Sequence, residues 1–241
     1  PGVEPLRSTR RGCQFAQTRY LLSTPGHILG VDADQESLAN PFGMDAECRN
    51  CDELCDARTN VVHGYGDVGG EFCFVAERPH EGADQTGIPF TGDDAGRRLQ
   101  RILTELGFSR SSPDADDPDL QNAFVTYLTR CRHPERPPTD DEIRTCEPYL
   151  SAELRMINPE IIVPIGQRTL DALATEYTTN RPGDVEVGEA HATTIRGRGF
   201  ELVPMVPLDD QTDAQTAAFV DHLLENVFTR DYRQTKGRRG R

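Results

Sequence analysis

The sequence predicts an α/β protein with three layers, in which helices cover both faces of a central four-stranded parallel sheet. Four short apolar runs occur along the chain, and each is followed by a segment with apolar residues at helical spacing. This alternation is typical of βαβ units, whose helices bury both faces of a parallel sheet. The four predicted strands are residues 72–76, 123–128, 161–165 and 202–206.

The helices after the first two strands have clear starting signals. The first is predicted to cover about 93–108, with Asp93 as its N-cap. Its inward face is predicted to hold Leu99, Ile102, Leu103 and Leu106. The second begins at Thr139, and Glu142 completes a capping box with it. Its predicted inward residues are Ile143, Leu150, Leu154 and Ile157.

The other two helices follow the third and fourth strands. The third strand ends at Gly166 and leads into a helix through Leu170 and Leu173. The last helix is predicted to cover about 213–228. Its predicted inward residues are Ala217, Val220, Leu224 and Val227. Ligands of such sheets bind beyond the carboxyl ends of the strands, so the functional site is expected there. The loops concerned are 77–92, 130–138 and 207–211.

The chain is expected to hold one domain, residues 41–230. It is preceded by residues 1–40, which have little periodicity and are expected to form a poorly ordered extension. It is followed by a basic tail, residues 231–241. No stretch approaches the roughly 18 apolar residues that a membrane helix needs. We therefore expect a cytoplasmic monomer with no membrane partner.

The charge balance is strongly acidic. Asp and Glu total 40 against 26 Lys and Arg, the net charge is −14, and Lys236 is the only lysine. Such a composition suits a protein kept soluble at very high ionic strength, as in halophiles. It excludes an argument for DNA binding from net charge alone. It does not exclude DNA as a partner, because at high salt an enzyme must rely on shape, stacking and a few local arginines.

Four cysteines form the most distinctive pattern in the chain. Cys48 and Cys51 form a Cys-x-x-Cys pair, and Cys131 and Cys146 lie far downstream. Four thiolates arranged in this way indicate one tetrahedral site, for either zinc or a [4Fe-4S] cluster. Such a metal would hold remote parts of the domain together.

Other interpretations of the cysteines remain open. Disulfides are disfavoured because the total of seven is odd and no apolar signal segment precedes them. Cys73 lies in an apolar run and is expected to be a small buried hydrophobe. Cys55, close to Cys51, is an alternative ligand.

Several ordered motifs resemble those of the iron-sulfur, family-4 uracil-DNA glycosylases. Residues 75–79, Val-Ala-Glu-Arg-Pro, followed by 84–96, which contain Thr-Gly-Ile-Pro-Phe-Thr-Gly, are similar to the first family motif. Residues 130–134, Arg-Cys-Arg-His-Pro, resemble a second motif, and residues 58–64 match the stretch after the first cysteine pair. The similarity spans about residues 45–228 and identifies the chain as a divergent, haloarchaeal member.

The resemblance implies a [4Fe-4S] cluster held by Cys48, Cys51, Cys131 and Cys146, and a DNA substrate. It implies that Phe90 stacks on a flipped base and that Glu77 is the acidic residue of the first motif. An aromatic wall recovers part of the stacking energy lost when a base leaves the duplex. A carboxylate after a strand can order the attacking water or stabilise positive charge on the sugar. Alternatively, Phe90 is a buried loop anchor and Glu77 caps its loop.

The chain departs from the family motifs at three places. Ala76 and His80 replace two glycines of the first motif. Tyr127 stands where the family has the Asn that reads the base edge, and a phenol cannot offer an amide's paired donor and acceptor. Residues 206–209, Val-Pro-Leu-Asp, replace the family's His-Pro-Ser. We expect reduced or altered activity, with His80 as the candidate substitute for the missing histidine.

These observations predict a DNA base-excision glycosylase that acts on uracil or another damaged base. The alternative is a noncatalytic iron-sulfur protein that binds DNA or senses lesions. A redox or metal-storage role is disfavoured, because no tight ferredoxin-like cysteine run is present. Each candidate phosphate contact is an arginine that could instead form an exposed ion pair. These candidates are Arg97, Arg98, Arg130, Arg132, Arg196 and Arg198.

Overall fold

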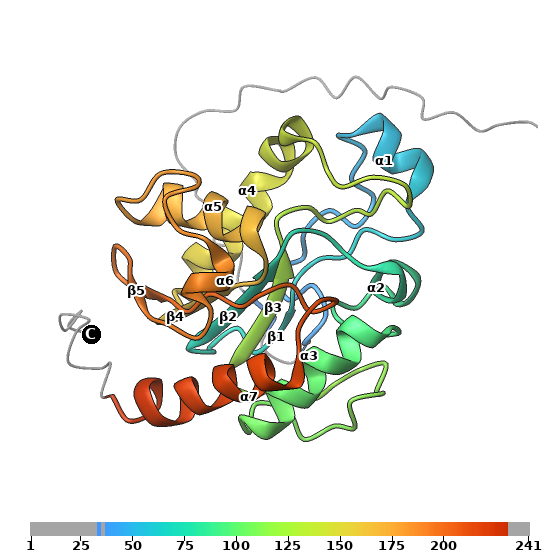
Figure 1. Cartoon of the computed structure of the whole chain (residues 1–241). Helices are drawn as coiled ribbons and strands as arrows, with labels where there is room; N and C mark the ends of the chain where they lie inside the picture. Colours follow the sequence, from blue (N-terminus) through green and yellow to red (C-terminus); the bar gives the residue numbers. More distant parts are fainter. Residues whose placement is uncertain (1–32, 35–36, 231–241) are drawn as a thin grey trace, which may run out of the picture.

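The computed structural model describes residues 33–34 and 37–230. Its core is one sheet of six strands in the order β1-β3-β2-β4-β6-β5, flanked by helices (Figure 1). The strands are β1 (Tyr65–Gly66), β2 (Phe72–Ala76), β3 (Ala123–Tyr127), β4 (Ile161–Pro164), β5 (Ile195–Arg196) and β6 (Glu201–Leu202).

The four predicted strands form the parallel centre of this sheet. β2 pairs in parallel with β3 and β4, and β4 pairs in parallel with β6. The two edge strands, β1 and β5, are antiparallel, so the sheet is mixed. The sequence did not predict these edges, because two residues give no periodic signal. β6 is shorter than expected because Pro204 has no N–H, although Met205 still donates to the carbonyl of Pro164 at 2.9 Å.

The helices are α1 (Asp52–Ala57), α2 (Glu81–Thr86), α3 (Asp94–Glu105), α4 (Asp140–Ile157), α5 (Gln167–Tyr177), α6 (Val187–Ala190) and α7 (Asp213–His222), with a π-helical turn at Leu223–Val227. The predicted caps are confirmed. The Asp93 carboxylate accepts from the N–H of Gly96, and Thr139 and Glu142 form the reciprocal capping box. Buried residues of α3 and α7 pack on one face of the sheet, and those of α4 and α5 pack on the other, which confirms the three layers.

The predicted inward face of α7 is partly wrong. Ala217 and Leu224 are exposed, while Phe219, Val220 and Leu223 are buried together with Val227. The larger Phe219 side chain buries more apolar area than Ala217 would. The π-helical turn also adds a residue at Leu223–Val227 and shifts the inward face.

Contacts with the domain begin before residue 41. The N–H of Gly66 donates to the carbonyl of Leu38 at 2.9 Å, and Ala39 forms an isolated bridge with Tyr65. The rest of the expected extension, residues 1–32 and 35–36, and the basic tail lie outside the described residues. Within the described ranges, no helix has the length and apolarity needed to cross a membrane.

A buried ion pair joins the end of β3 to α4. The Arg130 side chain is 1% exposed, and one guanidinium nitrogen lies 2.6 Å from the Glu153 carboxylate. A second nitrogen donates to the carbonyl of Tyr127 at 3.0 Å. Glu153 also accepts from the N–H of Gly64 at 3.1 Å and from the Thr126 hydroxyl at 2.7 Å. The prediction that Arg130 contacts DNA is therefore wrong, because its charge is enclosed and paired.

Replacing one partner of this pair should strongly destabilise the fold. Arg130→Met leaves the Glu153 carboxylate buried without a counter-charge, and we expect a loss of roughly 3–5 kcal/mol in the free energy of unfolding. Urea unfolding followed by circular dichroism measures the loss. Arg144→Met is the matched control, since Arg144 pairs with Asp141 on the exposed surface of α4 and should change stability by at most about 1 kcal/mol. Equal losses in both variants would contradict the structural role of the pair.

Candidate active site

A large cavity of about 690 Å³ lies beyond the carboxyl ends of the parallel strands. Its walls come from all three loops that the sequence predicted, and from the start of α3. The connection between β4 and α5 and the first turn of α5 were not predicted as walls of the cavity and contribute residues 165–169. The cavity is therefore built by segments that the sheet topology brings to one edge.

Glu77 lies in this cavity directly after β2. One of its carboxylate oxygens accepts a hydrogen bond from Arg168 of α5 at 2.9 Å. Arg168 also pairs with Asp140 and donates to the carbonyl of Pro138, so it connects three loops. The sequence did not indicate Arg168, because no local motif marks it. The carboxylate of Glu77 is thus oriented by a neighbouring element of the fold.

His80 lies across the same cavity, where it precedes α2. Its Nδ1 atom is 3.7 Å from a carboxylate oxygen of Asp209. Asp209 lies in the loop after the last parallel strand, three residues past Val206, in the segment that replaces the family's His-Pro-Ser. The fold therefore brings the candidate substitute imidazole to the loop from which the motif histidine is missing.

Only one of the predicted DNA-binding arginines lines the cavity. Arg132 does so, 3.8 Å from Glu81. Arg97 and Arg98 lie on α3, where they pair with Asp94 and Asp213. These two contacts match the alternative interpretation of the arginines as surface ion pairs.

The structure does not bring Arg196 and Arg198 to the cavity. In the sheet register, Arg196 of β5 lies opposite Glu201, the first residue of β6. Glu201 in turn lies opposite Ile161, the first residue of β4. Both arginines therefore lie at the amino ends of the parallel strands, opposite the cavity. Their predicted contact with DNA phosphates therefore finds no support in the position of this cavity.

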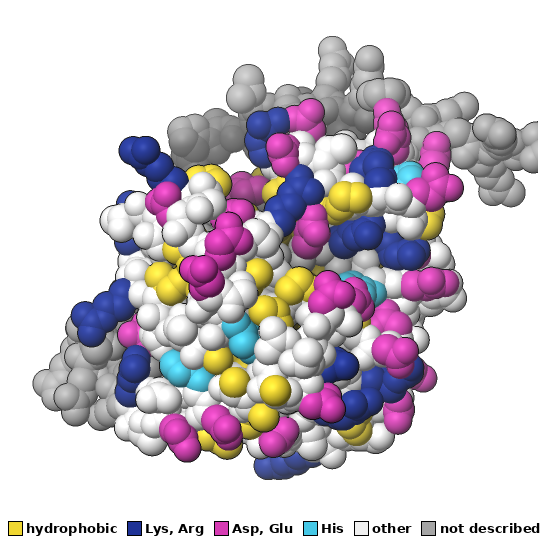
Figure 2. All heavy atoms as spheres, in the orientation of Figure 1, with side chains coloured by type: hydrophobic (Ala, Val, Ile, Leu, Met, Phe, Trp, Pro, Cys, Tyr) yellow, Lys and Arg dark blue, Asp and Glu magenta, His cyan; other side chains and the backbone are white. Residues whose placement is uncertain are grey.

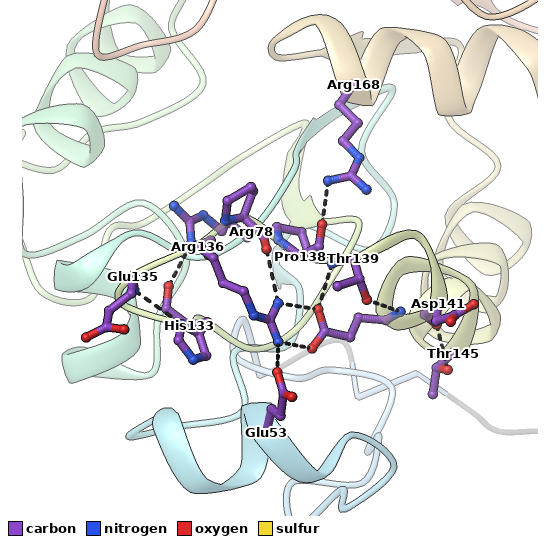
Figure 3. Close-up of polar contacts among 12 residues, drawn as sticks. Glu53, Arg78, His133, Glu135, Arg136, Pro138, Thr139, Asp141, Thr145 and Arg168 are labelled. Atoms are coloured by element: carbon purple, nitrogen blue, oxygen red, sulfur yellow. Dashed lines mark hydrogen bonds and ion pairs between the residues drawn. The ribbon is translucent and has the colours of Figure 1, made fainter.

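Two arginines that the phosphate-contact prediction omitted do reach the cavity. Arg78 and Arg168 line it together with Arg132. Arg78 donates to the carbonyl of His133 at 2.7 Å and to that of Arg136, which fixes the second loop against the first (Figure 3). On the face shown in Figure 2, basic side chains are interleaved with acidic ones and do not form a continuous basic patch.

The two predicted base-binding residues contact each other. The rings of Phe90 and Tyr127 are stacked, with centroids 4.8 Å apart and planes 29° apart. The Tyr127 hydroxyl accepts a hydrogen bond from the N–H of Phe90 at 3.0 Å. Phe90 is 3% exposed and Tyr127 is fully buried. In this arrangement Phe90 is a buried loop anchor, as the alternative interpretation expected.

The family follows from comparison of the whole domain. The model of the uracil DNA glycosylase superfamily matches residues 63–227. The chain belongs to the uracil-DNA glycosylase superfamily.

Members of this superfamily from several microorganisms are similar to the chain. The type-4 uracil-DNA glycosylase of Saccharolobus solfataricus is 31% identical over 193 residues, 79% of this chain and 81% of the relative. That of Sulfurisphaera tokodaii is 34% identical over 64% of this chain and 61% of the relative. That of Archaeoglobus fulgidus is 36% identical over 60% of this chain and 69% of the relative.

The four cysteines expected from the superfamily resemblance line one small cavity between α1, α4 and the loop after β3. The lining includes Cys48, Cys51, Cys131 and Cys146 but not Cys55. Within the part of the chain that the structure describes, no group of three or more His, Cys, Asp or Glu side chains is arranged to hold a metal ion. The four thiols thus share a cavity without having converged to coordination geometry.

The chemistry of this cavity favours a cation. Burial, followed by the proximity of Cys146 and Cys131, raises the pKa of Cys51 to about 12. Burial likewise raises the pKa of Cys131 to about 11. Several thiolates in one buried site repel each other, and a bound metal removes this cost because it is the largest local positive charge. Arg58 donates to the sulfur of Cys131 at 3.0 Å and to the carbonyl of Cys48, linking the two remote parts of the quartet.

Arg136 forms two ion pairs, called the Arg136 clasp below, that connect the helices beside the thiol cavity to the loop that lines the large cavity. Arg136 lies between Glu53 of α1 and Glu142 of α4, at 2.5 and 2.8 Å (Figure 3). The hydrogen bond from Arg136 lowers the pKa of Glu142 from 4.5 to about 2. The sequence indicated Glu142 as a capping residue only.

This clasp predicts a pH-dependent stability. The folded-state pKa of Glu142 lies below its ordinary value, so its stabilisation is complete above about pH 4.5 and is lost as the pH falls towards 2. At pH 7, Glu142→Gln should lower the free energy of unfolding by on the order of 2 kcal/mol, less than the full shift implies because Arg136 is partly solvated. Chemical unfolding at several pH values should show the two proteins converging towards pH 2. Asp141→Asn, on the exposed side of the same turn, is the control; a difference for Glu142→Gln that is independent of pH would refute the clasp.

Proposed function

We propose that this protein binds DNA and hydrolyses the N-glycosidic bond of uracil or another damaged base. The main support is the position of Glu77, whose carboxylate lies in the large cavity and is held by Arg168. Membership of the superfamily, and relatives named as type-4 uracil-DNA glycosylases, support the reaction class. A flipped nucleotide entering the cavity would place its sugar near this carboxylate.

In the proposed reaction, Glu77 orders a water molecule for attack on the anomeric carbon and stabilises the positive charge that develops on the sugar. Both effects require a carboxylate at a fixed position, which the hydrogen bond from Arg168 provides. His80, oriented towards Asp209, is the proposed donor to the departing base. Water adds to the sugar carbon, and the base leaves with the bonding electrons and a proton.

DNA is proposed to lie across the mouth of the cavity, where Arg78, Arg132 and Arg168 would contact phosphates. Arg132 is retained from the sequence-based prediction, and Arg78 and Arg168 take the place of Arg130, Arg196 and Arg198. Acidic neighbours such as Glu81 and Asp140 already pair with two of them. Phosphate binding must therefore compete with internal ion pairs, so affinity should depend on a few local contacts and not on the net charge.

The proposed cofactor is a [4Fe-4S] cluster bound by Cys48, Cys51, Cys131 and Cys146. The shared cavity and the thiol repulsion support this ligand set, and the absence of Cys55 from the lining disfavours the substitute ligand. The cluster would link α1 to α4 and to the loop that carries Arg132. Its proposed role is structural.

A noncatalytic lesion-binding protein is the second candidate. The burial of both Phe90 and Tyr127 favours it, because no aromatic face of this pair is open to a flipped base. A protein that binds damaged DNA without base release needs the scaffold and the arginines but not the hydrolytic geometry.

Single-turnover assays in molar KCl distinguish these candidates. Among oligonucleotides that carry uracil or hypoxanthine, single-stranded and duplex, at least one should release its base with the unaltered protein. Glu77→Gln should lower the rate by about 10²–10³-fold, because a neutral amide stabilises the sugar cation poorly. Glu105→Gln, on the exposed end of α3, is the control and should keep the rate. Tight lesion binding without base release would favour the second candidate, and the absence of both would contradict the proposed function.

Iron content tests the proposed ligand set. Cys131→Ser should abolish the visible absorbance and the stoichiometric iron of the purified protein, since a thiolate ligand is lost. Cys55→Ser should retain both. Loss of iron in Cys55→Ser but not in Cys131→Ser would show that the ligand set is wrong.

A further inference from the structure

Phe90 is held in an unusual backbone conformation by three contacts. Its φ angle is 55°, in the left-handed region that bulky residues rarely adopt. Its N–H donates to the Tyr127 hydroxyl, and its carbonyl accepts from the Gln100 side chain at 3.4 Å. A Cβ atom at Gly96 would lie 2.6 Å from the Phe90 carbonyl carbon, so only glycine allows α3 to pack this close. The Phe90 ring is therefore presented at a fixed place.

Tyr127 occupies the space against this ring. It ends β3 in register with Ala76, which lines the large cavity. Its ring stacks on that of Phe90 with centroids 4.8 Å apart, and its oxygen accepts from a backbone N–H. A six-membered planar ring with a carbonyl oxygen could make these same two interactions. The phenol thus resembles a bound pyrimidine in both shape and hydrogen bonding.

We infer that Tyr127 is a specificity-determining residue that fills the base-stacking place beside Phe90 and excludes uracil from it. This inference rests on the proposed function, and it assigns that place to uracil-like pyrimidines once the phenol is removed. Phe90 and Tyr127 do not line the large cavity, but Ala76, the cross-strand partner of Tyr127, does. Truncation of Tyr127 should therefore open the stacking place towards the cavity that holds Glu77.

The alternative is that the pair is an ordinary aromatic contact of the core. In that case a cavity made by truncating Tyr127 would behave like any other apolar cavity in the same cluster. It would bind small apolar molecules but would show no preference for uracil, whose polar edges need hydrogen-bonding partners. Under the inference, the N–H of Phe90 that the truncation frees would be one such partner.

Thermal unfolding with free uracil as the probe tests the inference without relying on catalysis. Uracil at about ten times its Kd should raise the Tm of Tyr127→Ala by roughly 3–6 °C. It should not shift the unaltered protein or Tyr127→Phe, which retains the ring. Leu103→Ala makes a matched cavity elsewhere in the same cluster and should also show no shift. A uracil shift in the unaltered protein, or one for Tyr127→Ala no larger than for Leu103→Ala, would overturn the inference.

Excision assays add a second readout. Single-turnover release of uracil from single-stranded DNA should be at least tenfold faster with Tyr127→Asn than with Tyr127→Phe. Equal and measurable rates of uracil release in the unaltered protein and in Tyr127→Asn would overturn the inference while leaving the proposed function intact. If no variant releases any base but uracil still shifts Tyr127→Ala selectively, the proposed hydrolysis fails and the assignment of the stacking place stands.

Discussion

The buried ion pair between Arg130 and Glu153 holds the chain at the point where β3 ends and the thiol-bearing loop begins. Its guanidinium donates to the carbonyl of Tyr127, and its backbone N–H lies 3.4 Å from the sulfur of Cys146. The next residue is Cys131. The stacked aromatic pair on one side and the thiol cavity on the other thus depend on the same contact, which would not tolerate loss of either charge.

The residues on the two sides of Arg130 in the chain contribute to two different sites. Residues before Arg130 belong to β3, whose last residue, Tyr127, stacks on Phe90. Residues after it lead to Arg132 in the large cavity, and Arg136 then closes the loop onto α1 and α4. A cluster in the thiol cavity would reinforce the same connections. The geometry of the proposed active site is therefore coupled to the thiol cavity through covalent neighbours and ion pairs.

The sequence predicted the central strands and the starts of two helices, because short stretches of neighbouring residues determine them. The apolar runs gave the four central strands, and the capping side chains of Asp93 and Thr139 placed the starts of α3 and α4. The edge strands were missed because two residues show no periodicity. The inward face of α7 was partly wrong because a π-helical turn changes the spacing of its last residues.

The sequence predicted which loops form the candidate site, because the order of the strands places them. It did not predict which side chains of those loops point into the site. The loops at the carboxyl edge were expected, and Glu77, His80 and Arg132 do line the cavity. Arg168 was missed because it comes from a remote segment without a recognisable motif. The contact of Asp209 with His80 was missed because the sequence does not show which side chains of two predicted loops meet. Arg130 was misassigned because its position after a strand does not reveal that the side chain turns inward to Glu153.

The most direct test of the account is a crystal structure of the protein bound to an oligonucleotide that carries a non-cleavable uracil analogue. The account predicts that the flipped nucleotide enters the cavity at the carboxyl ends of the strands, with its sugar beside Glu77 and its phosphates near Arg78, Arg132 and Arg168. DNA bound at another face, such as the edge formed by β5, would contradict it.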